Sequence, residues 1–142
     1  MTVFRIGEAA ELLGVSADTV RRWVDAGRLP AERDTHSHRV IAGPELAAFA
    51  RSLAAEPDGR SDASSARNRL RGIVTAIVKD TVMAQVDIQA GPFRIVSLMS
   101  REAVEDMGLQ VGDVAIAVIK STTVVVERLS PISGGPKGRS TP

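Results

Sequence analysis

The sequence predicts an α+β chain of two small domains, a mainly helical one at the N-terminus and a β-rich one at the C-terminus. Apolar residues recur at helical spacing before residue 54, and short β-branched runs dominate after residue 69. Between these regions, residues 55–64 contain no large apolar side chain, which is typical of a flexible, solvated linker. We therefore expect domains at residues 1–54 and 65–130, joined by a linker at residues 55–64.

Composition excludes several classes of protein. The 142 residues carry 18 Lys and Arg against 17 Asp and Glu, so a net charge of +1 gives no global attraction to nucleic acid. The absence of cysteine excludes disulfides, thiol nucleophiles and zinc–cysteine clusters. The N-terminus lacks the pattern of a signal peptide, and no apolar run approaches the ~18 residues of a membrane span. We expect a cytoplasmic protein with no membrane partner.

Two short helices and a glycine turn are predicted first. Apolar positions at helical spacing indicate a helix from Phe4 that ends at Gly14, where a positive φ suits glycine. Ser16 is placed to cap a second helix that runs to Ala26. Val20 is expected to fill the space between the helices, as in a helix-turn-helix.

The opposite side of the second helix is mainly polar, which suits a helix that enters a DNA major groove. Its candidate contact residues are Ser16, Ala17, Thr19, Arg21 and Arg22. A polar loop follows and predicts a small wing, in which His38 and Arg39 would lie near phosphate or the minor groove. The alternative is that these side chains are ordinary solvated surface. His36 and His38 are too few to hold a metal, so no cation site is expected.

A third helix is expected from Gly43 to about Leu53, with Pro44 in its first turn. With it, residues 4–53 resemble the winged helix-turn-helix of the MerR family and the related excisionase-like domains. The matching motifs are Arg5-Ile6-Gly7-Glu8-Ala9-Ala10, Gly14-Val15-Ser16, Thr19-Val20-Arg21-Arg22-Trp23, Gly27-Arg28-Leu29-Pro30 and His38-Arg39. The resemblance implies double-stranded DNA as a partner. MerR regulators usually continue into a long dimerising helix, whereas here a linker follows.

The second domain is expected to be an OB-like five-stranded β-barrel. The β-branched runs at residues 72–79, 83–88, 93–99, 114–119 and 124–129 predict the strands. Ser100 can cap a two-turn helix that Gly108 ends. Residues 131–142 are rich in glycine and proline and are expected to form a disordered tail.

Two short sequence motifs, which we call the anion words, flank the predicted strands and have the composition of an anion-binding site. The first supplies Ser65, Ala66, Arg67 and Asn68, and the second supplies Lys120, Ser121 and Thr122. Cations, hydroxyls and exposed amides can converge on a negatively charged guest, and neither word contains a reacting group. The alternative is a linker serine and a solvated strand-end lysine. No acid, base and nucleophile set appears in either domain, so no enzyme is expected.

Residues 65–129 resemble the Mop or TOBE domain of molbindins and molybdate-responsive regulators. The matching words are Ser65-Ala66-Arg67-Asn68-x-Leu70-x-Gly72, Ser97 to Ser100, Gly108-Leu109-x-Val111-Gly112 and Ala117-Val118-Ile119-Lys120-Ser121-Thr122. The resemblance implies molybdate, or tungstate, as a bound oxyanion held by the seven residues above. The binding sites of this family lie between copies of the domain, and this sequence contains only one copy. The resemblance therefore implies a homo-oligomer, at least a dimer and possibly a hexamer through the barrel.

Together the two domains predict a cytoplasmic, molybdate-responsive, DNA-binding transcriptional regulator. The β domain would sense the anion and the helical domain would recognise an operator. The alternative is a molybdate storage or homeostasis protein whose helix-turn-helix serves another partner. Salt-dependent retention on a promoter fragment distinguishes the two hypotheses.

Overall fold

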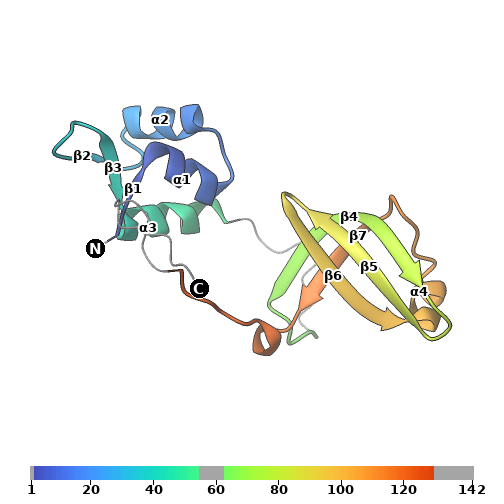
Figure 1. The fold of residues 1–142 in the computed structure, drawn as a ribbon. Helices are drawn as coiled ribbons and strands as arrows, with labels where there is room; N and C mark the ends of the chain where they lie inside the picture. Colours follow the sequence, from blue (N-terminus) through green and yellow to red (C-terminus); the bar gives the residue numbers. More distant parts are fainter. Residues whose placement is uncertain (1, 55–62, 130–142) are drawn as a thin grey trace, which may run out of the picture. The chain divides into compact units, whose positions relative to one another are not determined.

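The computed structural model describes residues 2–54 and 63–129, which form two compact units (Figure 1). One unit lies within residues 2–54 and the other within residues 63–127. The predicted linker, apart from Ala63 and Ser64, lies outside the described residues. The predicted tail at residues 131–142 lies outside them too, so both expectations stay predictions.

The N-terminal unit packs three helices against a small antiparallel sheet in the strand order β1-β3-β2. Its elements are β1 Val3–Arg5, α1 Ile6–Leu13, α2 Ala17–Asp25, β2 Glu32–Arg33, β3 Arg39–Ala42 and α3 Gly43–Leu53. The first helix begins later than predicted, because Phe4 pairs with Ile41 across the β1–β3 ladder. The predicted loop forms a hairpin in which Arg33 is opposite Arg39.

The turn between α1 and α2 has the predicted chemistry. The Ser16 hydroxyl accepts the N–H of Thr19 at 3.2 Å and caps α2. Gly14 ends α1 at φ 69°, and the next N–H, from Val15, returns to the carbonyl of Ala10 at 3.0 Å. The predictions for Gly14 and Ser16 are confirmed.

A closed hydrophobic core holds this unit together. Val20 from α2, Ile41 from β3 and Leu29 from the connecting loop are almost completely buried. The Trp23 and Phe49 rings lie 4.9 Å apart between centroids, which joins α2 to α3. Removing this much apolar surface from water is the main force that stabilises such a unit.

The C-terminal unit is an antiparallel sheet of four strands in the order β6-β5-β4-β7. Its elements are β4 Asn68–Lys79, β5 Met83–Ala90, β6 Phe93–Ser100, α4 Arg101–Met107, β7 Val114–Ile119 and the short 3-10 helix η1 Ser121–Thr123. The first half of β4 pairs with β7 and the second half with β5, with a register shift between Val74 and Ala76. Gly72 is required at this crossing, because a Cβ there would lie 2.5 Å from the carbonyl oxygen of Gln89.

The predicted five-stranded barrel is wrong in two respects, its closure and its fifth strand. Four of the five strands form, but the sheet is open, with β6 and β7 at its edges. The fifth run, residues 124–129, continues beyond η1 without joining a ladder. Its β-branched composition gives these residues a local preference for extended backbone, but a strand also requires hydrogen-bonded pairing with a neighbouring strand. The exposed fractions of Val125 and Val126 are 85% and 87%.

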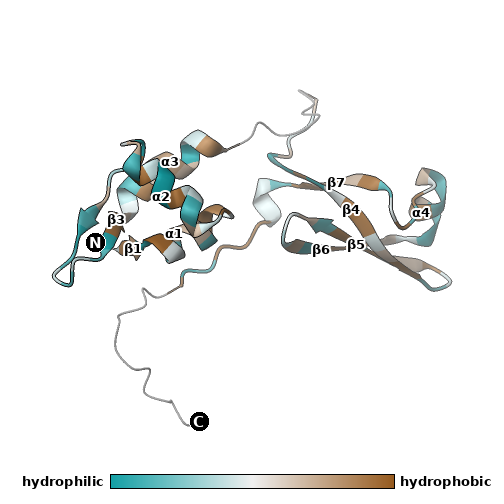
Figure 2. Cartoon of the chain, turned by 90° about the horizontal axis from the view of Figure 1, so that it is seen from above, coloured by the Kyte–Doolittle hydropathy of each residue, from teal (hydrophilic) through white to brown (hydrophobic). Residues whose placement is uncertain are grey.

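The two faces of the large sheet differ. One face buries Val74, Val86 and Ile88 beneath Val104 of α4, whose N-terminus is capped by the Ser100 hydroxyl as predicted. The other, which we call the outer face, leaves seven large apolar side chains exposed: Ile73, Val78, Val96, Leu98, Val114, Ile116 and Val118. Figure 2 shows hydrophobic residues along β4 and β7.

The outer face also carries an ion pair. Asp87 is 8% exposed and its Oδ2 lies 2.7 Å from Arg94 Nη2, while Gln85 donates to its other oxygen at 3.1 Å. Hydrogen bonding from Arg94, and then from Gln85, lowers the pKa of Asp87 below its usual value.

Candidate functional site

The pairing of β4 with β7 brings the two predicted anion words together. Asn68 is opposite Ile119, so the residues just before β4 lie beside those just after β7. The Asn68 side chain fixes this junction by donating to the carbonyl of Ile119 at 3.2 Å. Residues more than fifty positions apart along the sequence therefore meet at one end of the sheet.

The seven predicted residues have different environments at this junction. Ser65, Arg67, Lys120, Ser121 and Thr122 are exposed, Asn68 is half-buried and Ala66 is buried. Burial of Ala66 anchors the first word, while the charged and hydroxyl groups remain accessible to a guest.

Local hydrogen bonds shape each word. Arg67 Nη1 donates to the carbonyls of Ser64 at 3.2 Å and Ala66 at 3.4 Å, so its guanidinium folds over its own segment. In the second word, the Thr123 N–H and hydroxyl donate to the Lys120 carbonyl at 3.0 and 2.8 Å. These bonds close the η1 turn and hold the backbone of Ser121 and Thr122 next to Lys120.

This arrangement offers the kinds of donor that a bound oxyanion needs. Two cations and several hydroxyls provide the donors that an acceptor-only tetrahedral dianion requires. The groups are solvated in a single chain, where exposed charge pairs contribute little free energy. Tight binding therefore requires further desolvation of the junction.

The predicted DNA-contacting residues of α2 form an accessible surface. Ser16, Arg21 and Arg22 are exposed, whereas Ala17 and Thr19 are half-buried. Arg21 Nη1 lies 2.6 Å from Asp18 Oδ1, and Arg22 Nη2 donates to the Thr19 hydroxyl at 3.3 Å. These contacts, each one helical turn apart, hold both guanidinium groups along the helix.

The hairpin of β2 and β3 is fixed by one carboxylate. Asp34 Oδ1 accepts the N–H groups of His36 and His38, both at 2.9 Å, and these bonds lower the pKa of Asp34. The neighbouring Arg39 extends to α2, where its Nη1 lies 2.7 Å from Asp25 Oδ1. The hairpin and the end of α2 are thereby linked.

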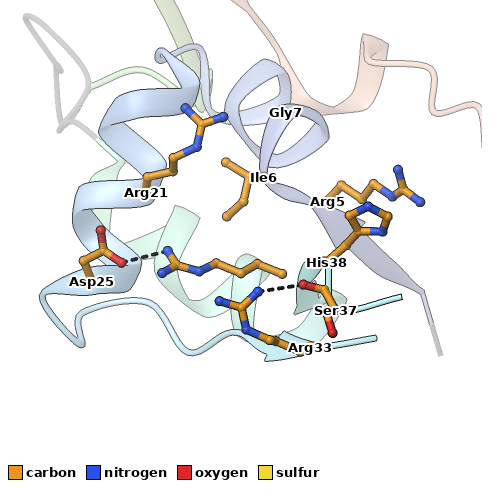
Figure 3. A pocket seen from close by; sticks show the side chains of 9 residues that line it. Arg5, Ile6, Gly7, Arg21, Asp25, Arg33, Ser37 and His38 are labelled. Atoms are coloured by element: carbon orange, nitrogen blue, oxygen red, sulfur yellow. Dashed lines mark hydrogen bonds and ion pairs between the residues drawn. The ribbon is translucent and has the colours of Figure 1, made fainter. Parts of the chain in front are cut away.

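A cleft of about 500 Å³ lies between α2, the start of α1 and the hairpin (Figure 3). It brings Arg21, His38 and Arg39 together, but Ser16, Ala17, Thr19 and Arg22 do not line it. Its lining is Arg5, Ile6, Gly7, Arg21, Asp25, Arg33, Ser37, His38 and Arg39. Sequence reasoning missed Arg5 and Arg33 as site residues. Their charge was the only local signal, and only the fold places them beside α2.

Among residues 2–54 and 63–129, no group of three or more His, Cys, Asp or Glu side chains is arranged to hold a metal ion. Within the same described ranges, the structure contains no helix with the length and apolar character needed to span a membrane.

Two family models match separate parts of the chain. The model described as the TOBE domain matches residues 64–126, and the model described as MerR family regulatory protein matches residues 5–41. Both resemblances found in the sequence are confirmed. The TOBE match includes the β4–β7 junction, and the MerR match includes α1, α2 and the hairpin.

Curated relatives match the C-terminal unit. Molybdenum-pterin-binding protein 3 of Clostridium pasteurianum is 43% identical over 63 residues, covering 44% of this chain and 93% of the relative. The molybdenum transport protein ModE of Herbaspirillum seropedicae is 41% identical over 64 residues, which cover 44% of this chain and 24% of that protein. Among solved structures, a molybdate-binding protein from Sporomusa ovata is 34% identical, with a TM-score of 0.45, over 46% of this chain and 97% of its own.

Proposed function

The chain belongs to the TOBE-domain family, with a MerR-family segment ahead of that domain, and from this premise we propose that it is a molybdate-responsive, DNA-binding transcriptional regulator. In this proposal the C-terminal unit binds molybdate or tungstate and the N-terminal unit binds double-stranded DNA. The main support for the proposal is the β4–β7 junction, because the pairing of these strands brings the two anion words together.

The donor set supports an oxyanion as the ligand. Arg67 and Lys120 supply positive charge, and Ser65, Ser121, Thr122 and nearby N–H groups supply hydrogen bonds. The names of the curated relatives specify molybdenum, which narrows the class of oxyanion. Tungstate has the same charge and shape, so we expect it to bind too.

The surface of α2 supports DNA as the partner. Arg22 is exposed on α2 and lies one turn from Thr19, so its guanidinium is accessible to the edge of a base. With the hairpin acting as the wing, the unit would work as a winged helix-turn-helix. A bidentate arginine–guanine contact contributes about 1–3 kcal/mol of discrimination.

The apolar outer face and residues 124–129 support a homo-oligomer, at least a dimer. A single chain leaves Val96, Leu98 and Val118 of the outer face exposed, and Val125 and Val126 of the unpaired segment are exposed too. Exposed apolar surface of this extent marks an interaction site. A second copy that covered the junction would lower the effective dielectric around Arg67 and Lys120 and strengthen anion binding.

The proposal is tested by measuring both ligands on one protein. We expect titration calorimetry to show tight binding of molybdate and tungstate and weak binding of sulfate, whose shorter bonds would lengthen the hydrogen bonds of a cavity fitted to the larger ions. We expect retention on a promoter fragment that falls steeply with salt and changes with molybdate. Equal affinity for sulfate would indicate a general anion site.

Paired variants separate the two activities. Lys120→Ala should weaken molybdate binding by about 1.5–3 kcal/mol, the worth of a charged hydrogen bond, without changing DNA affinity in the absence of anion. Arg22→Ala should weaken operator binding by about 1–3 kcal/mol without changing molybdate binding. Molybdate binding without any DNA binding would favour storage or homeostasis instead.

A further inference from the structure

The cleft of the N-terminal unit has a charge that the proposed base-reading residues do not explain. Four arginines, Arg5, Arg21, Arg33 and Arg39, line it, and Asp25 is the one acidic residue among the lining residues. Four like charges around one hollow attract an anion. This excess of positive charge suits the cleft to a negatively charged partner.

Internal contacts hold three of these arginines in place. Arg33 Nη1 donates to the Ser37 carbonyl at 2.6 Å, Arg39 pairs with Asp25 at 2.7 Å, and Arg21 pairs with Asp18 at 2.6 Å. Each guanidinium has five N–H donors, so one such contact leaves most of them available. Dashed lines in Figure 3 mark the contact between Arg33 and Ser37 and the ion pair of Asp25.

Arg5 differs from the other three. Its backbone N–H donates to Glu8 Oε1 at 3.0 Å, which satisfies the start of α1. Its guanidinium makes no hydrogen bond or ion pair with any residue in the described part of the chain, and the residue is exposed. Arg5 is thus the arginine of the cleft that is fully available to a ligand.

We propose that this cleft seats a phosphate group of the DNA backbone, with Arg5 and Arg33 as sequence-independent anchors beside the base-reading face of α2. The inference rests on the proposed function and adds to it residues outside α2. Phosphate contacts fix the register of a protein on the duplex, whereas base contacts select the sequence. The cleft and the Arg22 side of α2 would therefore make different contributions to one complex.

The test measures DNA affinity against salt concentration for the full chain. Two probes are used, a random-sequence duplex and a duplex that the wild-type protein selects from a randomised library. Arg5→Gln should weaken binding to both duplexes by a similar factor. It should also lower the slope of log affinity against log salt by about 0.9, the value for one phosphate contact. The variant's loss of affinity between about 50 and 200 mM salt should then be smaller than that of the wild type by about threefold.

Two controls accompany this variant. Arg51→Gln makes the same charge change at an exposed site on α3 that does not line the cleft, so it should keep the wild-type slope. Arg5→Lys keeps the charge without the planar fork, so it should recover most of the slope. Trp23 fluorescence on unfolding reports whether each variant keeps the folded N-terminal unit.

The outcomes are distinct. A loss confined to the selected duplex would make Arg5 a base reader and overturn the inference. A wild-type slope for Arg5→Gln would overturn it as well, while leaving the proposed function intact. Failure of the wild-type protein to bind either duplex would overturn both proposals. In that case, inorganic phosphate that shifted the amide signals of Gly7 and Ser37 would identify a site for a free anion.

Discussion

The two units differ in how completely one chain covers their apolar side chains. In the N-terminal unit, α1, α2, α3 and β3 surround one core, and Val20 and Ile41 have no exposed surface. In the C-terminal unit, α4 covers one face of the sheet, while the outer face and residues 124–127 remain uncovered. A sheet that is apolar on both faces needs cover on both. From this comparison we predict a helical unit that is complete in one chain and a sheet that a partner completes.

The largest expected effect comes from Val126→Asp, at a position that is 87% exposed in the single chain. If a second copy covers this segment, the new carboxylate is buried there at a cost of about 3 kcal/mol or more. We expect loss of the oligomer and of tight molybdate binding, measured by light scattering and calorimetry. Leu12→Asp, at a 65% exposed position of the N-terminal unit, is the matched control and should change neither. If the Val126→Asp variant kept its oligomeric state, the prediction that a second copy covers this segment would be wrong.

Gly72→Ala tests how tightly the strands of the large sheet approach each other. The new Cβ would lie 2.5 Å from the Gln89 carbonyl and 2.7 Å from Ile88 Cγ2, so β4 or β5 must move. We expect a destabilisation of up to about 3 kcal/mol, measured by hydrogen exchange of the amides of β4 and β5. Gly7→Ala has no atom within 4 Å of the new Cβ and should leave the N-terminal unit as stable as before. Equal effects of the two substitutions would contradict the close approach at Gly72.

Val20→Ala tests the closed core of the N-terminal unit. The substitution removes two methyl groups at a fully buried position and should cost about 2 kcal/mol. Trp23 is the only tryptophan of the chain and packs against this core, so its fluorescence follows the unfolding of this unit alone. We expect a lower urea midpoint by this probe with molybdate binding unchanged. A parallel loss of molybdate affinity would show that the units depend on each other.

The smallest expected effect is a difference in sensitivity to acid. Among the described residues, hydrogen bonds lower the pKa of Asp80, Asp87 and Glu105 in the C-terminal unit, but only of Asp34 in the N-terminal unit. For Asp80 the main cause is the Met83 N–H, for Asp87 it is Arg94, and for Glu105 it is Arg101.

A carboxyl whose folded-state pKa is lowered stabilises the fold above its unfolded-state pKa, and this stabilisation is lost as the pH falls through the folded-state value. For all four groups that range lies below about pH 4. We expect the C-terminal unit to lose more stability there than the N-terminal unit, measured by amide signals of both units during acid titration. Asp87→Asn should reduce the difference, and a steeper loss in the N-terminal unit would contradict the assignment.

The sequence by itself determined the features that depend on near neighbours. The Ser16 and Ser100 caps, the left-handed turns at Gly14 and Gly108 and four of the β strands are all present. Each depends on groups within about four residues or on a local preference of the backbone, which side-chain type largely sets. Both anion words and the polar face of α2 were also recognisable as patterns.

Only the tertiary structure decided which distant groups meet. Residues 124–129 have the composition of a strand, yet the described part of the chain offers them no ladder. The β4–β7 register, not the content of either word, brings Asn68 beside Ile119, and the packing of the hairpin against α2 brings Arg33 into the cleft with Arg5. Hydrogen-bonded pairing and packing depend on which edges and faces remain free once the chain has folded. The residues of one segment do not specify which edges and faces of the folded chain will be free to pair with it.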